Sequence, residues 1–247
     1  MKKIFLSLLM LIMVVSLCAC SKEDKKDSEK DSKEQENISK TQVPDKNTQS
    51  DSKNNNTLAN NETSVIENIT LEDVMNHPVT PESDFQVVTL DDGTCEIVSY
   101  TGNDNILVIP ETIDGMKVVG IRHKSFYRDK NIVGLKLSDT IEYVDYEAFR
   151  MAKQLKFVVC GTNLKKISEA AFFDCPNLSE VKLNEGIEFL GVGAFAATEL
   201  KSIYIPQSAT EIMSFVKMNE DFTIQGVSGS KAESYAAEKG FKFEAVN

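Results

Sequence analysis

Three stretches of the sequence repeat one pattern of apolar residues. Residues 132–149 read IVGLKLSDTIEYVDYEAF, residues 155–172 read LKFVVCGTNLKKISEAAF, and residues 178–195 read LSEVKLNEGIEFLGVGAF. In each stretch, apolar or small residues stand at positions 0, 3, 5, 9, 12 and 17, and the starting residues Ile132, Leu155 and Leu178 are evenly spaced. Agreement of this kind at a fixed period predicts a solenoid in which each turn is one repeat.

The spacing within a repeat predicts the path of the chain. Positions 3 and 5 are two apart, which is the period of a strand with one buried face. The later apolar positions mark the return path, and a small residue before each phenylalanine, such as Ala148, leaves room for a tight turn. A single repeat buries too few side chains to offset the entropy of ordering its backbone, so the turns must stack on one another.

Two incomplete repeats flank the three complete ones. A fourth unit starts one position early, at Leu200, and loses its phenylalanine because Lys217 stands at that position. A unit with a longer middle comes before the complete repeats, and its apolar residues are Leu107, Ile109, Val118, Ile121 and Phe126. We therefore expect repeats over about 104–217.

Segments on either side of the repeats predict caps for the two ends of the solenoid. Residues 85–100 alternate around Asp91-Asp92-Gly93, which is a strong hairpin signal. Residues 218–247 predict a strand at 222–224, a helix between Ser230 and Gly240, and a returning strand at 241–243. The predicted fold class is an α+β repeat solenoid with a β-hairpin N-terminal cap and a helix-strand C-terminal cap, over residues 85–247.

These residues resemble a known family. The segments VIPETIDG at 108–115, CPNL at 175–178 and IYIP at 203–206, together with the repeated Ala-Phe pairs, look like the BspA-type leucine-rich repeats of bacterial surface proteins. Residues 229–240 are similar to a closing segment often found after such repeats. The resemblance implies a leucine-rich-repeat fold, and it implies adhesion or binding to a host or matrix partner, as some family members show.

The N-terminus has the layout of a secretion signal. Lys2 and Lys3 precede an apolar run over residues 4–17 that is too short to be a convincing transmembrane span. The run ends in Leu17-Cys18-Ala19-Cys20, which resembles the lipobox of bacterial lipoproteins. The resemblance implies that residues 1–19 are a removed signal peptide and that acylated Cys20 anchors the protein to the outer face of a bacterial cell membrane. An ordinary signal peptide with incidental cysteines is the alternative.

A polar segment separates the lipobox from the repeats. Over residues 21–64 only Ile38, Val43, Leu58 and Ala59 are apolar, too few to offset the loss of chain entropy on folding. We expect residues 20–64 to be a disordered, lipid-anchored tether. Residues 65–84 then predict a short helix and a connector, because Thr70 and Asp73 make an N-terminal capping signature and Pro78 prevents extension.

The net charge excludes one class of partner. The formal charge is −11, and because the charges of segment 1–64 cancel, segment 65–247 carries all of it. Proteins bind nucleic acid by displacing counterions with Lys and Arg, so a domain this acidic is an unsuitable partner for nucleic acid.

No residue pattern indicates catalysis, a cofactor or a metal site. The two histidines, His77 and His123, are far apart in the sequence, and no nucleophile elbow, HExxH motif or phosphate-binding glycine loop occurs. Cys160 stands at an apolar position and is expected to be a small buried residue. A disulfide between Cys160 and Cys175 is the alternative in an exported protein, and it would leave Cys95 free. We expect a protein that is not an enzyme.

The outer face of the predicted strands is the candidate ligand surface. Positions 2 and 4 of the repeats place aromatic, aliphatic and cationic side chains there, a composition typical of recognition surfaces. These residues are Lys136, Phe157, Val159, Lys182 and Tyr204, and Glu180 interrupts them. The alternative is that strand-forming residues merely pair sideways along the sheet.

These features together predict a surface lipoprotein that displays a binding or adhesion module to a protein or glycan partner. A solute-binding lipoprotein of a transport system shares the anchor, but such proteins need two lobes around a cleft. An envelope-associated enzyme, or a regulator of one, is a further alternative, and it would need catalytic residues that the sequence does not show.

Overall fold

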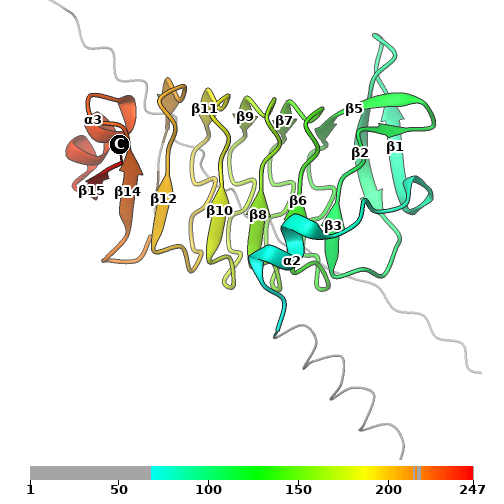
Figure 1. Ribbon diagram of the computed structural model, residues 1–247, viewed down its shortest axis with the longest axis horizontal. Helices are drawn as coiled ribbons and strands as arrows, with labels where there is room; N and C mark the ends of the chain where they lie inside the picture. The colour runs from blue at the N-terminus through cyan, green and yellow to red at the C-terminus, as the bar shows by residue number, and fades with distance from the viewer. Residues whose placement is uncertain (1–67, 214, 216–217, 247) are drawn as a thin grey trace, which may run out of the picture. The chain divides into compact units, whose positions relative to one another are not determined.

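The repeats stack as the turns of a β-solenoid of about six turns, as their even spacing predicts (Figure 1). The computed structural model describes residues 68–213, 215 and 218–246. The expected signal peptide, Cys20 and the tether at 20–64 lie outside the described residues. Each complete turn contributes one strand to each of two sheets, so the core lies between them.

The strands at positions 2 to 4 of the turns form one parallel sheet, which we call the front sheet. Its order is β10-β8-β6-β3, and its bounds are β3 Ile106–Val108, β6 Gly134–Lys136, β8 Phe157–Val159 and β10 Glu180–Lys182. The register follows the repeat, because Gly134 pairs with Phe157 and Phe157 with Glu180. The middle residue of each strand is buried, and the residues on either side of it face outward onto what we call the outer face.

The return path of each turn forms the rear sheet. Its order is β1-β2-β5-β7-β9-β11-β13, and the short strand β4 (Thr112–Ile113) pairs with β5 off this path. The bounds are β1 Phe85–Thr89, β2 Cys95–Tyr100, β5 Met116–Ile121, β7 Tyr143–Val144, β9 Lys166–Ile167, β11 Phe189–Leu190 and β13 Glu211–Ile212. The β4–β5 hairpin turns at Asp114-Gly115, where both residues are left-handed, and it accounts for the longer middle of the first unit.

The predicted hairpin is present at the N-terminal end of the rear sheet. Strands β1 and β2 are antiparallel around the Asp91-Asp92-Gly93 turn, and β2 pairs in parallel with β5. A short 3-10 helix, η1 (Glu82–Asp84), leads into β1. The hairpin therefore extends the rear sheet by two strands beyond the first repeat.

The C-terminal segment adds a helix and two strands. Strands β12 (Ser202–Tyr204), β14 (Thr223–Gly226) and β15 (Lys242–Ala245) form a three-stranded parallel sheet. Between β14 and β15, helix α3 (Lys231–Lys239) begins after Ser230, whose side chain accepts from the Glu233 amide, and ends at left-handed Gly240. Its buried face is Ala232, Tyr235 and Ala236, the face that the sequence indicates.

A row of phenylalanine rings runs through the core. Phe126, Phe149, Phe172 and Phe195 stack with centroid separations of 4.6, 5.3 and 5.4 Å. The expectation that the fourth unit loses its phenylalanine is wrong, because Phe215 lies 6.3 Å from Phe195 and continues the stack. The Phe215 amide donates to the Tyr235 hydroxyl at 2.7 Å, so the C-terminal helix fixes this shorter turn.

The short helix expected before the repeats is present as α2 (Leu71–Asn76). The Thr70 side chain accepts from the Asp73 amide, and the Asp73 carboxylate accepts from the Thr70 amide, so both halves of the capping box form. The helix ends before Pro78, as expected. It lies across the front sheet, a position that the sequence does not indicate (Figure 1).

Candidate functional site

The outer face of the front sheet, continued by β12 and β14, carries all five residues of the predicted ligand surface. Lys136, Phe157 and Val159 lie on β6 and β8 and are half-buried, Lys182 lies on β10 and is exposed, and Tyr204 lies on β12 and is half-buried. The structure places them on one side of the solenoid, but it does not bring them together into one patch.

Helix α2 covers the N-terminal half of this face. Val74 of α2 is fully buried and forms a small cluster with Ile106 and Val108, against which Phe157 and Val159 pack. The Lys136 ammonium group donates to the Met75 carbonyl at 2.7 Å. Two predicted ligand residues, Phe157 and Val159, therefore already have an apolar partner from the same chain.

The rest of the face is open and is divided by a seam. In the described part of the chain, β10 and β12 do not pair with each other. The four-stranded front sheet and the three-stranded C-terminal sheet are therefore separate. The seam falls where the repeat shortens, because Leu200 follows Leu178 one position earlier than the preceding repeats require. Between the other neighbouring turns, backbone hydrogen bonds link adjacent strands. At Cys160, for example, the amide donates to the Lys182 carbonyl at 2.9 Å.

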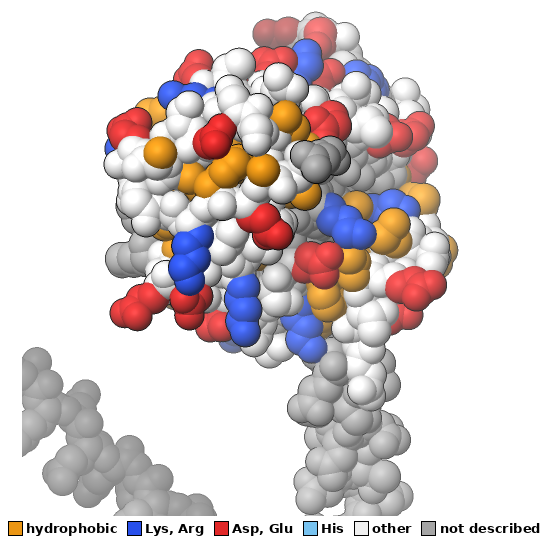
Figure 2. All heavy atoms as spheres, turned by 60° about the vertical axis from the view of Figure 1, so that its left-hand side comes forward, with side chains coloured by type: hydrophobic (Ala, Val, Ile, Leu, Met, Phe, Trp, Pro, Cys, Tyr) orange, Lys and Arg blue, Asp and Glu red, His pale blue; other side chains and the backbone are white. Residues whose placement is uncertain are grey.

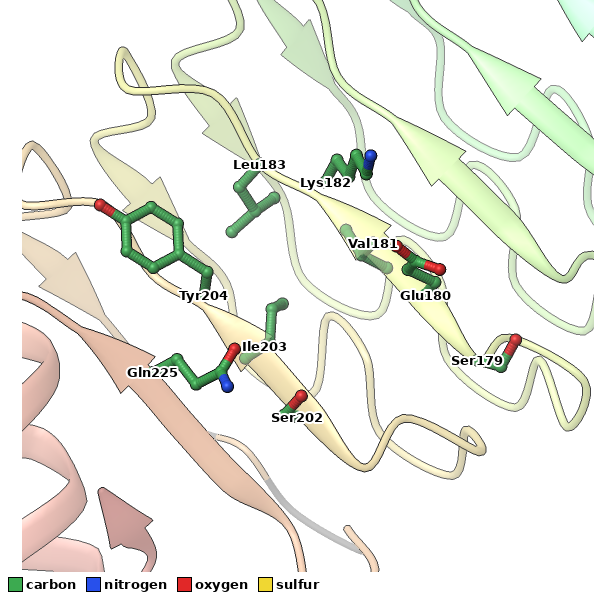
Figure 3. A pocket seen from close by; sticks show the side chains of 9 residues that line it. All are labelled: Ser179, Glu180, Val181, Lys182, Leu183, Ser202, Ile203, Tyr204 and Gln225. Carbon is green, nitrogen blue, oxygen red and sulfur yellow. The ribbon is translucent and has the colours of Figure 1, made fainter. Parts of the chain in front are cut away.

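A shallow groove of about 510 Å³ follows this seam. In Figure 3, Leu183 and Ile203 lie between the two strands, and the side chains of Lys182 and Tyr204 extend from β10 and β12. The lining is mixed in chemistry and consists of Ser179, Glu180, Val181, Lys182, Leu183, Ser202, Ile203, Tyr204 and Gln225. We call these nine residues the seam groove.

Hydrogen bonds orient the polar side chains at the seam groove. The Tyr204 hydroxyl donates to Glu185 Oε1 at 3.0 Å, and the Gln225 side-chain amide donates to Glu244 Oε2 at 2.7 Å. Burial, followed by the hydrogen bond to Glu185, raises the pKa of Tyr204 above its usual value. The groove thus offers a fixed aromatic ring with hydroxyl, amide, carboxylate and ammonium groups around it.

The residues that could carry catalysis or bind a metal are dispersed. Within the described ranges, no group of three or more His, Cys, Asp or Glu residues is placed to hold a metal ion. His77 lies 3.1 Å from the Pro78 carbonyl oxygen through its Nδ1 atom, and exposed His123 lies beside the Tyr146 ring. Neither histidine belongs to a strand of the front sheet.

The three described cysteines are free thiols. Cys95 and Cys175 are buried, and Cys160 packs against the core, so the alternative of a Cys160–Cys175 disulfide does not apply to this structure. Loss of solvation raises the pKa of both Cys160 and Cys175 to about 12. Thiols with so high a pKa are poor nucleophiles at neutral pH, because little thiolate is present.

Comparison with known proteins identifies the repeats. Residues 115–227 match the family model described as a BspA type leucine-rich repeat region, in six copies. The structure is similar to that of a T. pallidum leucine-rich repeat protein, with a TM-score of 0.57 and 24% identity over 60% of this chain and 71% of the other. A leucine-rich repeat protein from Bacteroides ovatus is also similar, with a TM-score of 0.48 and 24% identity over 62% of this chain and 41% of the other. No curated protein sequence matches the chain.

The likeness to the T. pallidum protein, at 24% identity, shows the fold alone. None of the helices in the described part of the chain is long and apolar enough to cross a membrane.

Proposed function

Residues 115–227 of this chain are BspA-type leucine-rich repeats, which makes it a leucine-rich repeat protein, and on that premise we propose that it binds a protein or glycan partner without catalysis. Leucine-rich repeats are protein-interaction modules, and the repeat architecture is not an enzyme fold. The role is therefore to present a rigid surface to a partner.

The observation that carries this proposal is the open half of the outer face. In the seam groove, half-buried Tyr204 shares the lining with exposed Glu180, Lys182 and Ser202. Aromatic residues that are fixed in place and ringed by polar groups are common anchors of binding surfaces. Four of the five residues first predicted lie at or beside α2, and only Tyr204 lies wholly in the open half, so Tyr204 is the central residue of the proposed site.

The charge distribution favours a partner that is not a polyanion. Figure 2, which turns the C-terminal end toward the viewer, shows acidic and basic side chains interspersed with small apolar areas. Near the seam groove, Lys182 is accompanied by Glu180, Glu185 and Glu244. A neutral or weakly basic protein surface, or a neutral glycan, is compatible with this mixture of charges. Neither partner would be strongly repelled by a surface that carries both acidic and basic groups.

We further propose that the protein is a surface lipoprotein anchored through Cys20 on the outer face of a bacterial membrane. The lipobox-like sequence and the polar segment after it support this location. The anchor and tether would hold the repeats away from the lipid, and the binding role would then be adhesion. A transporter's solute-binding protein is less compatible, because the described residues form one solenoid and not two lobes around a cleft.

Partner capture with matched variants tests the proposed site. The biotinylated chain, without its signal peptide, is presented to extracellular proteins and to a glycan panel, and bound partners are quantified by surface plasmon resonance. Tyr204→Ala should weaken binding by about tenfold or more, as expected for an aromatic anchor that the partner covers. The control is Phe189→Ala, which removes a half-buried aromatic ring from strand β11 of the rear sheet. Equal binding by the wild type and Tyr204→Ala would show that the partner binds elsewhere.

A further inference from the structure

Helix α2 is held on the front sheet by a specific fit. Val74 is fully buried, yet it belongs to a small cluster that is separate from the main core of the solenoid. The cluster consists of Val74, Ile106 and Val108, with Ile69, Phe157 and Val159 packed around it. The helix therefore rests on the solenoid without being part of its core.

Gly134 provides the socket for Val74. A Cβ atom on Gly134 would lie 2.3 Å from Val74 Cγ2, a distance at which one of the two must move. At the repeat position of Gly134, the next two turns carry Phe157 and Glu180. Among these three turns, the outer face therefore lacks a side chain only beneath the helix. A β-branched side chain fills that gap.

The two ends of the helix are also accommodated. At its C-terminal end, the Lys136 ammonium group donates to the Met75 carbonyl at 2.7 Å, which suits the partial negative charge of a helix C-terminus. At its N-terminal end, the helix satisfies its own backbone through Thr70 and Asp73. The outer face thus supplies an apolar seat and the Lys136 cation at the helix C-terminus, while Lys182 contacts the Met75 sulfur atom.

Hydrogen bonds at Thr80, after the end of α2, also attach this segment to the solenoid. Buried Thr80 exchanges two hydrogen bonds with Val108, because its amide donates to the Val108 carbonyl at 3.1 Å and its hydroxyl accepts from the Val108 amide at 3.0 Å. These bonds pair the backbone amide and carbonyl of Val108 without involving α2. Because Thr80 lies outside α2, these bonds do not require the helix to be seated, and a helix that left the seat would uncover the apolar side chains of Ile106, Val108, Phe157 and Val159.

We propose that the outer face of β3, β6 and β8 is a docking site for a short amphipathic helix with a β-branched aliphatic residue at its centre, and that α2 occupies this site until a partner's helix replaces it. The bound α2 shows which chemistry the seat accepts. Because α2 is tethered at Thr80, its effective concentration is high, and a free helix competes only weakly until α2 is displaced. This site adjoins the seam groove at Lys182, whose ammonium group lies 3.6 Å from Met75 Sδ, but the proposal does not depend on the function proposed there.

A peptide in trans tests the docking site. The probe is a fluorescein-labelled, end-capped peptide with the sequence of residues 68–80, NITLEDVMNHPVT, and the receptor is the full chain carrying Val74→Asp. The aspartate cannot enter the apolar socket, so the seat is vacant. The peptide should bind this variant at least tenfold more tightly than it binds the wild-type chain, as measured by fluorescence anisotropy.

Two controls make the result specific to the socket. Adding Gly134→Val to the Val74→Asp chain fills the socket and should abolish peptide binding, and a peptide with Val74→Asp should not bind either chain. Equal binding of the peptide to wild type and Val74→Asp, or binding that survives Gly134→Val, would overturn the proposal.

A single substitution provides an independent readout. Gly134→Val in the otherwise wild-type chain should displace α2, so the amides of residues 71–76 should exchange with solvent at least tenfold faster while the exchange of the core strands stays unchanged. If α2 keeps its protection in Gly134→Val, the socket does not hold the helix and the proposal fails.

Discussion

Glu147 is a buried carboxylate that ties together two turns of the solenoid. Its side chain is 5% exposed and forms ion pairs with Arg150 and with Lys124, the latter at 3.3 Å. Burial acts to raise the pKa of Glu147, but hydrogen bonds from Arg150, Tyr146 and Lys124 outweigh it, so the pKa lies below its usual value. Because Lys124 belongs to the preceding turn, the carboxylate links successive repeats.

Removing this charge should make stability depend less on pH. A carboxyl group whose pKa is lower in the folded state than in the unfolded state stabilises the fold above the unfolded pKa of about 4.3, and this contribution is lost as pH falls through the folded pKa. Glu147→Gln should therefore cost about 1–3 kcal/mol at pH 7, with the difference from wild type shrinking below about pH 4. Urea unfolding at several pH values measures it.

The matched control is Glu142→Gln, which changes a carboxylate that is 43% exposed and paired with Lys117 at 3.1 Å. An exposed pair contributes about 0–1 kcal/mol. A pH-independent loss in Glu147→Gln, or equal losses in both variants, would contradict the role assigned to Glu147.

The sequence did not distinguish Glu147 from solvated carboxylates. At the same repeat position stand Lys124, Ala170 and Gly193, so no pattern marks it. What the four share is a left-handed backbone, which appears only once the turn is seen. The cysteines were easier to interpret, since an apolar repeat position indicates a packed side chain for Cys160 whatever its chemistry.

Among the elements of the fold, the phenylalanine stack joins one turn to the next. Phe172 is fully buried between Phe149 and Phe195, with centroid separations of 5.3 and 5.4 Å. Phe172→Ala should destabilise the protein by about 3–5 kcal/mol, because it opens a cavity that rigid turns on both sides cannot close. Thermal or urea unfolding followed by circular dichroism measures this loss.

The adjacent Phe173→Ala is the control for Phe172→Ala. Phe173 is only half-buried and lies beneath the Arg150 guanidinium group at 5.1 Å. Its loss should cost about 1 kcal/mol, the size of a partly exposed cation–π contact with some packing. Similar losses at both positions would show that the stack is not the main contact between turns.

The lack of pairing between β10 and β12 predicts fast hydrogen exchange at a single amide. The amides of Cys160 and Ile205 donate across the turns at 2.9 and 2.8 Å, to Lys182 and Gln225. Leu183 stands at the same repeat position as Cys160 and directly follows β10. Among the described residues, β10 does not pair with β12. The Leu183 amide should therefore exchange with solvent at least about tenfold faster than the amides of Cys160 and Ile205.

Residue-resolved hydrogen exchange by NMR tests the seam. Protection of the Leu183 amide equal to that of Cys160 would mean that the ladder is continuous in solution and that the groove is closed.

Local elements were predictable from the sequence and their long-range contacts were not. The strands of the front sheet, the 85–100 hairpin and helices α2 and α3 follow from apolar spacing and from capping residues, which act within one repeat or less. The seat of α2 depends on Gly134 and Lys136, which lie far from it in the sequence, and the connector between them has no periodicity to indicate its path. Phe215 was missed because its turn is shortened, so a fixed period pointed to Lys217.

For the molecule as a whole, location is the first property to test. Cys20→Ala removes the thiol that would carry the lipid, and with it the two or more acyl chains needed for firm membrane attachment. The variant should move from the membrane fraction to the soluble fraction and should not incorporate labelled palmitate, whereas Cys18→Ala should behave as wild type. Palmitate labelling of Cys20→Ala would place the anchor elsewhere.

The open outer face around the seam groove is the proposed place of contact between this protein and its partner. Hydrogen exchange of the full chain, with and without a captured partner, maps that contact without altering any residue. Protection on binding should be concentrated in β10, β12 and β14, around Lys182, Tyr204 and Gln225. Protection confined to the rear-sheet strands β7, β9 and β11, with none at Tyr204, would show that the partner binds the opposite side of the solenoid.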